Sequence, residues 1–271
     1  PNPVSIIYML KNDKIISDWM NAKGWQPFQY QLDTWKAIRE HKSGLVNAPT
    51  GCGKTFSVFI GAILKFMDAH PQDWHLKKQN GLKLLWVTPL RALAKDIGRA
   101  MEEAIVEIGI PWTVSIRNGD TSNAERQKQK KRLPEVLIIT PESLHLLLSG
   151  KSHEQLFAHL DLLVVDEWHE LLGSKRGVQT ELAISRIIHC NKNTIPMVWG
   201  ISATIGNLQE AKDVLLSPIL LSQRDATNGI VISAQLDKQI NVIPIYPDEI
   251  EQYPWAGHLG IKLAHKLIPI I

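Results

Sequence analysis

The feature that most constrains this chain is the segment Ala-Pro-Thr-Gly-Cys-Gly-Lys-Thr, residues 48–55. Its two glycines let the backbone curl until the N–H groups face a phosphate, so that Lys54 can reach the terminal phosphates of a nucleotide and Thr55 can hold Mg²⁺. An apolar run, residues 44–47, precedes the segment, and apolar residues at helical spacing follow it over residues 56–67. A strand, a glycine-rich loop and a helix in this order predict a nucleotide-phosphate site.

Composition limits the class of protein. The chain has 271 residues, 44% hydrophobic and 21% charged, as is typical of a soluble globular protein with one large or two small domains. No apolar run approaches the ~20 residues that span a bilayer, and no secretory leader is seen, so we expect no membrane partner and a cytoplasmic location. Two cysteines, Cys52 and Cys190, are too few for a zinc cluster or a disulfide framework. A net charge of +3 permits a nucleic-acid partner without requiring one.

Short apolar segments alternate with amphipathic ones after the glycine-rich segment. The predicted strands are residues 82–88, 112–116, 135–140, 160–165 and 196–201. Their nearly continuous apolar character is typical of parallel strands covered on both faces, and the alternation predicts an α/β fold with helices on both faces of a mostly parallel sheet. Ligands of such sheets bind at the carboxyl ends of the strands. Polar residues gather at these ends, namely Thr50, Thr88, Thr140, Asp166 and Ser202.

The pattern changes near Pro218. Three short strands without intervening helices are predicted there, at residues 219–222, 230–234 and 239–245. A proline-bounded acidic segment follows at residues 247–254, and the last residues look like the start of a helix. We therefore divide the chain into an α/β domain over residues 1–217, a short β-rich connector over residues 218–260 and the start of a further lobe over residues 261–271.

Two adjacent carboxylates, Asp166 and Glu167, follow the apolar strand at residues 160–165. A carboxylate at that position can meet a Mg²⁺ held by Thr55, while its neighbour orients or deprotonates the attacking water. Acidic residues also occur at helix N-termini because they complement the helix dipole. Their combination with a phosphate loop in one series of strands and helices favours the catalytic interpretation.

Six segments in the same order resemble the motifs of the DEXH-box helicases of superfamily 2. They are residues 48–55 (motif I), 89–93 (Ia), 140–144 (Ib), 166–169 (II) and 202–204 (III), together with Gln31, which occupies the place of the adenine-reading glutamine with Phe28 nearby. Residues 168–177 resemble the large helicase-related branch of this group. Within it, residues 111–114, 118–121 and 253–260 are most similar to the bacterial ligase-associated DNA damage response helicases.

The resemblance implies a role for each matching position. Nucleotide contacts are implied for Phe28, Gln31, Pro49, Thr50, Gly51, Cys52, Gly53, Lys54, Thr55, Asp166 and Glu167. Of these, Thr55 and Asp166 would hold the metal, and Glu167, Asp166 and Lys54 would be catalytic, with Glu167 as the general base. Coupling of the nucleotide to the nucleic acid is implied for His169, Ser202, Ala203 and Thr204. Nucleic-acid contacts are implied for Pro89, Leu90, Arg91, Gly119, Asp120, Thr140, Pro141, Glu142, Ser143 and Arg176.

The same resemblance implies a RecA-like fold and an overall function. The chain would be the ATP-binding first lobe of a DNA helicase that uses ATP and Mg²⁺ to move on single-stranded or partly duplex DNA. Motifs IV to VI, which belong to a second RecA-like lobe, have no match, and an arginine from that lobe contributes ~10³–10⁵ in turnover. We therefore expect the isolated chain to be nearly inactive. A DNA ligase and a nuclease of the same repair system are the protein partners that the resemblance implies.

Three alternatives remain open at this point. The first is an RNA-directed DEXH-box helicase, since no residue decides between DNA and RNA. A small-molecule kinase with a phosphate loop is the second, although it would not need the segments at residues 140–144 and 202–204. The third is a non-catalytic nucleic-acid-binding scaffold, which would have no use for Lys54 and the two acidic residues together.

Overall fold

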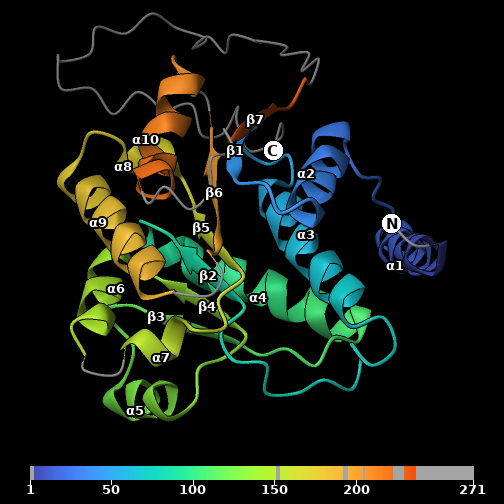
Figure 1. The fold of residues 1–271 in the computed structure, drawn as a ribbon, viewed down its shortest axis with the longest axis horizontal. Helices are drawn as coiled ribbons and strands as arrows, with labels where there is room; N and C mark the ends of the chain where they lie inside the picture. The colour runs from blue at the N-terminus through green and yellow to red at the C-terminus, as the bar shows by residue number, and fades with distance from the viewer. Residues whose placement is uncertain (1–2, 151–152, 192–194, 204, 222–228, 236–271) are drawn as a thin grey trace, which may run out of the picture. The chain divides into compact units, whose positions relative to one another are not determined.

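The apolar segments form a seven-stranded sheet in which every pair of neighbours is parallel, in the order β3-β4-β2-β5-β6-β1-β7 (Figure 1). The computed structural model describes residues 3–150, 153–191, 195–203, 205–221 and 229–235. The strands are β1 (Gly44–Asn47), β2 (Leu84–Val87), β3 (Val114–Arg117), β4 (Val136–Ile139), β5 (Leu162–Val165), β6 (Met197–Ser202) and β7 (Ile230–Ser233). The predicted parallel α/β fold is confirmed.

Ten helices are described along the same part of the chain. They are α1 (Pro3–Ala22), α2 (Gln29–Arg39), α3 (Lys54–Ala69), α4 (Arg91–Ile108), α5 (Asn123–Lys131), α6 (Pro141–Leu148), α7 (His153–Phe157), α8 (Trp168–Leu171), α9 (Lys175–Cys190) and α10 (Leu208–Leu221). None of these described helices is long and apolar enough to cross a bilayer.

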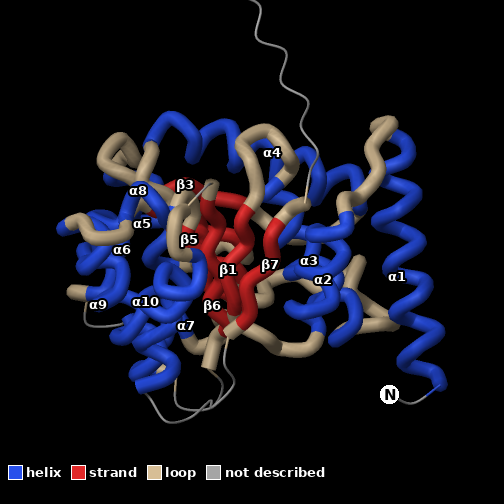
Figure 2. The backbone as a smooth tube through the Cα atoms, turned by 90° about the horizontal axis from the view of Figure 1, so that it is seen from above, coloured by secondary structure: helices blue, strands red, loops and turns tan. Residues whose placement is uncertain are grey.

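The helices cover both faces of the sheet, and each face has its own hydrophobic core. Helices α1 to α4 pack on one face and α6 to α10 on the other (Figure 2). Neighbouring strand residues alternate between the two cores: Trp86 and Val164 belong to the first, and Leu85 and Leu163 to the second. Because both faces of the central strands are buried, their sequences are apolar throughout rather than alternating.

The register of the strands decides which loops meet. Asn47 of β1 pairs with Ser202 of β6, so the segment after β1 starts beside the residues that end β6. Val87 of β2 pairs with Val165 of β5, which brings the residues after β2 next to Asp166. The carboxyl edge of the sheet therefore gathers segments that are far apart in the sequence.

The prediction for the last part of the α/β unit was partly wrong. Residues 219–221, predicted as the start of a strand, lie in helix α10, because Leu215 and Ile219, four residues apart, are both buried in the second core. The predicted strand at residues 230–234 is confirmed as β7, but it pairs with β1 in the main sheet. The first compact unit extends accordingly to Gln235. The strand predicted at residues 239–245, the linker at 247–254 and the start of a lobe at 261–271 lie outside the described residues.

Candidate nucleotide and nucleic-acid site

The glycine-rich segment connects β1 to α3, as the sequence predicted. Gly51 and Gly53 have φ angles of +82° and +75°, in the left-handed region that favours glycine. Gly53 is also the N-cap of α3, so Lys54 and Thr55 lie in the first turn of this helix. The free N–H groups of that turn and the positive end of the helix dipole both favour an anion at this position.

Helix α2 holds the phosphate loop through side-chain donors. The hydroxyl of Tyr30 donates to the carbonyl of Cys52, and Gln31 Nε2 donates to the carbonyl of Gly53 at 3.0 Å. Trp35 Nε1 donates to the carbonyl of Phe56 at 3.2 Å. Burial raises the pKa of Tyr30 further above its ordinary value of 10, which keeps its hydroxyl a donor. Sequence reasoning found Gln31 and missed the two aromatic residues, whose only local signal was their place on the same helix.

Gln31 and Phe28, the predicted adenine contacts, adjoin this loop. Gln31 is buried, with 3% of its surface exposed, and its Oε1 accepts the N–H of Phe28 at 2.9 Å. The Phe28 ring is 42% exposed and stacks on Tyr30 with centroids 6.0 Å apart. The side-chain amide of Gln31 retains one further N–H donor on Nε2 and one further lone pair on Oε1. The contact of these residues with adenine stays a prediction.

Lys54 presents a buried cation that the described residues do not satisfy. The residue is 8% exposed, and its Nζ makes no hydrogen bond in the described part of the chain. The nearest carboxylate oxygen is Glu167 Oε2, at 3.9 Å. A buried ammonium without hydrogen bonds is costly, and the phosphate oxygens of a nucleotide would supply the missing acceptors.

The two predicted acidic residues follow β5 at the same edge of the sheet. Trp86 Nε1 donates to Asp166 Oδ2 at 3.3 Å, and the N–H of Glu167 donates to Asp166 Oδ1 at 3.0 Å. Glu167 has a φ of +47°, an uncommon conformation for a residue with a side chain. These two hydrogen bonds fix the orientation of the Asp166 carboxyl group. The indole of Trp86, on a different strand, was not recognised from the sequence.

The residues present fit a magnesium ion. The Asp166 carboxylate and the Thr55 hydroxyl are oxygen donors of the kind that Mg²⁺ prefers, and Mg²⁺ takes its remaining ligands from water and from substrate phosphates. The unsatisfied Lys54 ammonium beside them indicates that this space is built for an anionic ligand. The described residues contain no group of three or more His, Cys, Asp or Glu side chains that would hold a metal by itself.

The state of Asp166 predicts a pH dependence of stability. Burial, with a smaller contribution from the Glu167 carboxylate, raises the pKa of Asp166 from 3.8 to about 6. Between pH 3.8 and about 6, Asp166 is therefore mostly protonated in the metal-free folded chain and mostly ionised in the unfolded chain. The stability from this group is fully present below the unfolded pKa and is lost, by about 3 kcal/mol, as the pH rises through 6.

Urea unfolding with a metal chelator, at pH values between 4 and 7, measures this loss. The Asp166→Asn variant carries no titrating group at this position, so between pH 4 and 7 its stability should fall by about 2 kcal/mol less than that of the wild type. Equal falls in the two proteins would contradict the raised pKa.

His169 connects the acidic pair to the segment after β6. Its Nδ1 lies 3.2 Å from Ser202 Oγ, 3.4 Å from the backbone N of Ala203 and 3.4 Å from Glu167 Oε2. Asn47, at the end of β1, fixes the segment further by donating from Nδ2 to the carbonyl of Ala203 at 2.5 Å. The predicted coupling residues are thus in contact, apart from Thr204, which lies outside the described residues.

The predicted nucleic-acid residues follow three neighbouring strands, β2, β3 and β4. Arg176, at the start of α9, joins two of these segments: its guanidinium donates to Glu142 Oε1 at 2.6 Å and to the carbonyl of Pro89 at 2.9 Å. Pro141 starts α6, where the Thr140 hydroxyl donates to Ser143 Oγ at 3.2 Å. The same edge of the sheet therefore holds both sets of predicted residues.

Arg91 lies over the loop that follows β3. Its guanidinium is 3.4 Å from Asp120 Oδ1, and a Cβ on Gly119 would come within 2.7 Å of it. Arg91 thus packs on Gly119, where a larger residue would displace it. Leu90, just before this arginine, is 47% exposed.

The basic helix α5 is hydrogen-bonded to this loop after β3. Arg126 donates to the carbonyls of Thr121 and Asn118 at 3.0 and 2.9 Å. Gln129, 2% exposed, accepts a hydrogen bond from Arg117 at 3.3 Å. One of the basic residues of α5 is therefore engaged in holding the loop, a role that the sequence pattern did not distinguish from that of a solvated face.

Comparison with known proteins identifies the family. The profile of the DEAD/DEAH box helicase family matches residues 28–212, which include all six recognised segments. The ATP-dependent helicase Lhr-Core of Methanocaldococcus jannaschii is 31% identical over 96% of this chain and 30% of its own length. The Lhr helicase/uracil glycosylase of Escherichia coli is 32% identical over 73% of this chain and 13% of its own length.

Solved structures agree with these relatives. The Lhr helicase of Mycobacterium smegmatis, bound to single-stranded DNA and AMP-PNP, superposes with a TM-score of 0.68 and 29% identity over 80% of this chain and 27% of that one. The helicase MrfA bound to DNA, at 24% identity and a TM-score of 0.65, covers 81% of this chain and 29% of that one and supports the fold. The chain spans less than a third of the length of these proteins. The resemblance to the large helicase-related branch is confirmed, and the chain belongs to the DEAD/DEAH box helicase family.

Proposed function

We propose that this chain is the nucleotide-binding first lobe of an ATP-dependent DNA helicase or translocase. The observation that carries the proposal is the unsatisfied ammonium of Lys54, which lies within 4 Å of Glu167 at an edge that also holds the predicted nucleic-acid residues. A kinase or a passive scaffold would not need the acidic pair to be connected to the segment after β6, as His169 connects them here.

The proposed mechanism gives each of these side chains a step. The phosphate loop and Lys54 would bind the β- and γ-phosphates of ATP. Thr55 and Asp166 would hold Mg²⁺, which would neutralise charge on the transferred phosphoryl group. The Glu167 carboxylate orients a water and takes its proton. The water oxygen then forms a bond to the γ-phosphorus, and the bond to the β–γ bridging oxygen breaks, which leaves ADP and phosphate.

We propose DNA as the track because the M. smegmatis Lhr helicase, which is 29% identical to this chain, was solved bound to single-stranded DNA. A motor that moves on any sequence must bind phosphate and sugar rather than base edges. The backbone N–H groups at the starts of α4 and α6 and the guanidinium of Arg91 suit such contacts.

The proposal includes parts that the described residues do not contain. A second RecA-like lobe of the parent protein would close the nucleotide site, in keeping with relatives more than three times as long as the matched region. An isolated first lobe is accordingly proposed to hydrolyse ATP very slowly. A ligase and a nuclease as partners, and a cytoplasmic location, rest on the resemblance and the composition alone.

The test measures ATP turnover of the full parent protein with and without single-stranded DNA, and with single-stranded RNA in a parallel series. We expect DNA to stimulate turnover and the Lys54→Ala parent to show none. Turnover that depends on Lys54 but responds to neither nucleic acid would favour the kinase alternative. Stimulation by RNA alone would replace DNA with RNA as the track.

Replacement of Arg176 tests the nucleic-acid face. Arg176→Ala removes the guanidinium that joins Pro89 to Glu142, so both segments lose a charge-assisted contact and single-stranded DNA should bind about tenfold more weakly. Lys175→Ala, an exposed neighbour with the same charge loss, is the control. Fluorescence anisotropy of a labelled oligonucleotide on the parent protein measures both. Equal losses in the two variants would contradict a specific role of Arg176.

A further inference from the structure

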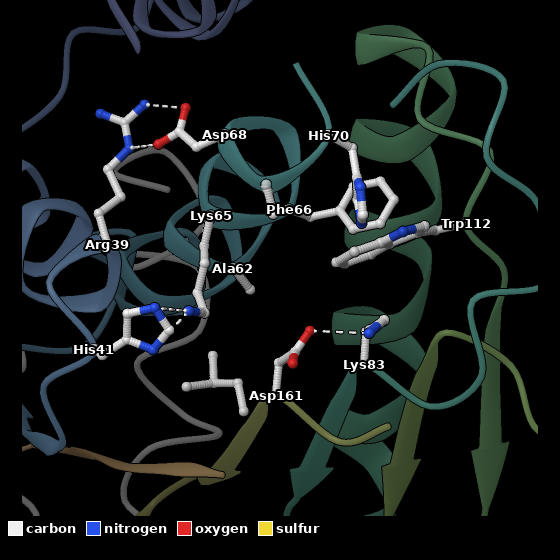
Figure 3. A pocket seen from close by; sticks show the side chains of 12 residues that line it. Arg39, His41, Ala62, Lys65, Phe66, Asp68, His70, Lys83, Trp112 and Asp161 are labelled. Atoms are coloured by element: carbon white, nitrogen blue, oxygen red, sulfur yellow. Dashed lines mark hydrogen bonds and ion pairs between the residues drawn. The ribbon is translucent and has the colours of Figure 1, made fainter. Parts of the chain in front are cut away.

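A cavity of about 400 Å³ lies at the amino-end edge of the sheet, opposite the nucleotide site (Figure 3). Its walls come from the ends of α2 and α3 and from the residues that immediately precede three strands. The side chains that carry the argument are His41, Lys65, Phe66, Lys83, Trp112 and Asp161. Its volume falls in the range of ~300–1,000 Å³ that is typical of small-molecule sites.

One wall of the cavity carries an ammonium without a matching carboxylate. Lys83 Nζ pairs with Asp161 Oδ2 at 3.2 Å. Lys65 Nζ instead lies 2.9 and 2.8 Å from the two ring nitrogens of His41, and no carboxylate of the described residues lies within 4.0 Å of it. Burial, and then the charge of Lys65, lowers the pKa of His41, so the imidazole is neutral at pH 7. Figure 3 shows the Asp161 carboxylate between the two lysines, which leaves this row with one excess positive charge.

The other cation of the cavity is already compensated. Arg39 NH1 lies 2.6 Å from Asp13 Oδ1, and its Nε lies 2.8 Å from Asp68 Oδ2. Asn12 Nδ2 donates to the other oxygen of Asp68 at 2.8 Å. Arg39 and Asp68 are therefore already paired. Lys65 is the cation of this wall that could bind an added anion.

The opposite wall is aromatic. The ring centroids of Phe66 and Trp112 are 5.0 Å apart, and those of Phe66 and His70 are 4.8 Å apart, both in edge-on arrangements. Trp112 is 6% exposed, and its Nε1 has no hydrogen-bond partner among the described residues. A buried indole N–H usually has an acceptor, so a bound molecule with a polar edge would satisfy this donor.

We propose that this cavity binds a small planar aromatic acid, a ring system with a single acidic group. The ring packs against Phe66 and Trp112, and the acidic group binds the ammonium of Lys65, because Lys83 is already paired with Asp161. The orientation follows from α3, whose last carbonyls, near His70, carry partial negative charge and repel an anion. The acid therefore faces the lysines, and the ring faces the end of the helix.

The cavity is separate from the nucleotide site. Lys54 begins α3 and Lys65 lies in its last turns, so at a rise of ~1.5 Å per residue the two are about 16 Å apart along the helix. The inference rests on the residues of the cavity and does not depend on the proposed helicase function. A molecule bound here should not compete with a nucleotide.

The experiment uses indole-3-carboxylate as the probe and the indole N–H signals of the ¹⁵N-tryptophan-labelled chain as the readout. Trp112→Phe assigns the signal of Trp112 by its disappearance. We expect a saturable shift of this signal, at least about tenfold weaker binding of the neutral indole-3-carboxamide, and a similar loss in Lys65→Met. Lys128→Met, which removes an exposed lysine 78% accessible on α5, should bind as the wild type does.

Several outcomes would overturn the proposal. Equal affinities for the acid and the amide would remove the role of the excess charge, and unchanged binding by Lys65→Met would remove the assigned group. Displacement of the probe by AMP-PNP would place it in the nucleotide site instead. Absence of any shift at millimolar probe would refute the site, provided that thermal melting shows each variant to be folded.

Discussion

Replacing Lys54 by methionine should abolish nucleotide binding without destabilising the fold. The ammonium is the main cation of the phosphate loop, and truncation of one partner of a buried charge pair costs ~2–5 kcal/mol, so we expect ATP to bind at least about 30-fold more weakly. Lys54 is also buried without a hydrogen bond among the described residues. Its removal should leave the free energy of unfolding unchanged or raise it by up to about 1 kcal/mol.

Two measurements separate these effects. Titration with a fluorescent ATP analogue in the presence of Mg²⁺ gives the affinity, and urea unfolding of the nucleotide-free chain gives the stability. Lys128→Met, which removes one exposed positive charge from α5, controls for net charge. A variant that lost stability by several kcal/mol would show that Lys54 supports the fold, and one that bound ATP normally would remove the phosphate-loop assignment.

Glu167→Gln should stop hydrolysis while nucleotide binding persists. An amide has the shape of the carboxyl group but does not accept a proton from water, so turnover of the parent protein should fall by ~10²–10⁴. The substitution keeps the φ of +47° that both residues must adopt, so the backbone change is small. Glu170→Gln, three residues on and 61% exposed in its side chain, is the matched control.

Single-turnover hydrolysis with saturating DNA measures the chemical step of the parent protein directly. The affinity for ATP should stay within a few-fold of the wild type in Glu167→Gln. If Glu170→Gln lost as much activity as Glu167→Gln, the base would have to be reassigned; if neither lost activity, the catalytic role of this acidic pair would be wrong.

Local patterns were sufficient for the centre of the site. The glycines of residues 48–55 require left-handed conformations that the structure shows, and a strand followed by Asp166 and Glu167 places both carboxylates at one edge of a parallel sheet. The order of the strands brings Ser202 beside Asn47, in accord with the general rule for ligands in such sheets. The positions of these residues in the fold could be predicted because each depended on a few consecutive residues and one general rule of topology.

Contacts between distant segments could not be predicted in this way. Trp86 donates to Asp166 across 80 residues of chain, and nothing near the tryptophan in the sequence marks its indole N–H as a partner of a carboxylate. The cavity at the amino-end edge is a stronger example, because its walls come from five separate parts of the chain. The prediction for residues 219–221 failed for another reason. A short apolar run such as Ile-Leu-Leu fits a strand as well as a helix until its packing on the second core is known.

The position of His169 limits which hydrogen bonds can form at this site at one time. Its Nδ1 lies 3.4 Å from a carboxylate oxygen of Glu167 and 3.4 Å from the backbone N of Ala203. A hydrogen bond to Glu167 requires a proton on Nδ1, whereas a hydrogen bond from the N–H of Ala203 requires a lone pair on Nδ1. A nitrogen carries one or the other. The imidazole can therefore bond to the acidic pair or to the segment after β6, but not to both at once. Moving between these arrangements requires that Nδ1 gain or lose a proton, so the protonation of one ring nitrogen decides which of the two parts of the site His169 contacts.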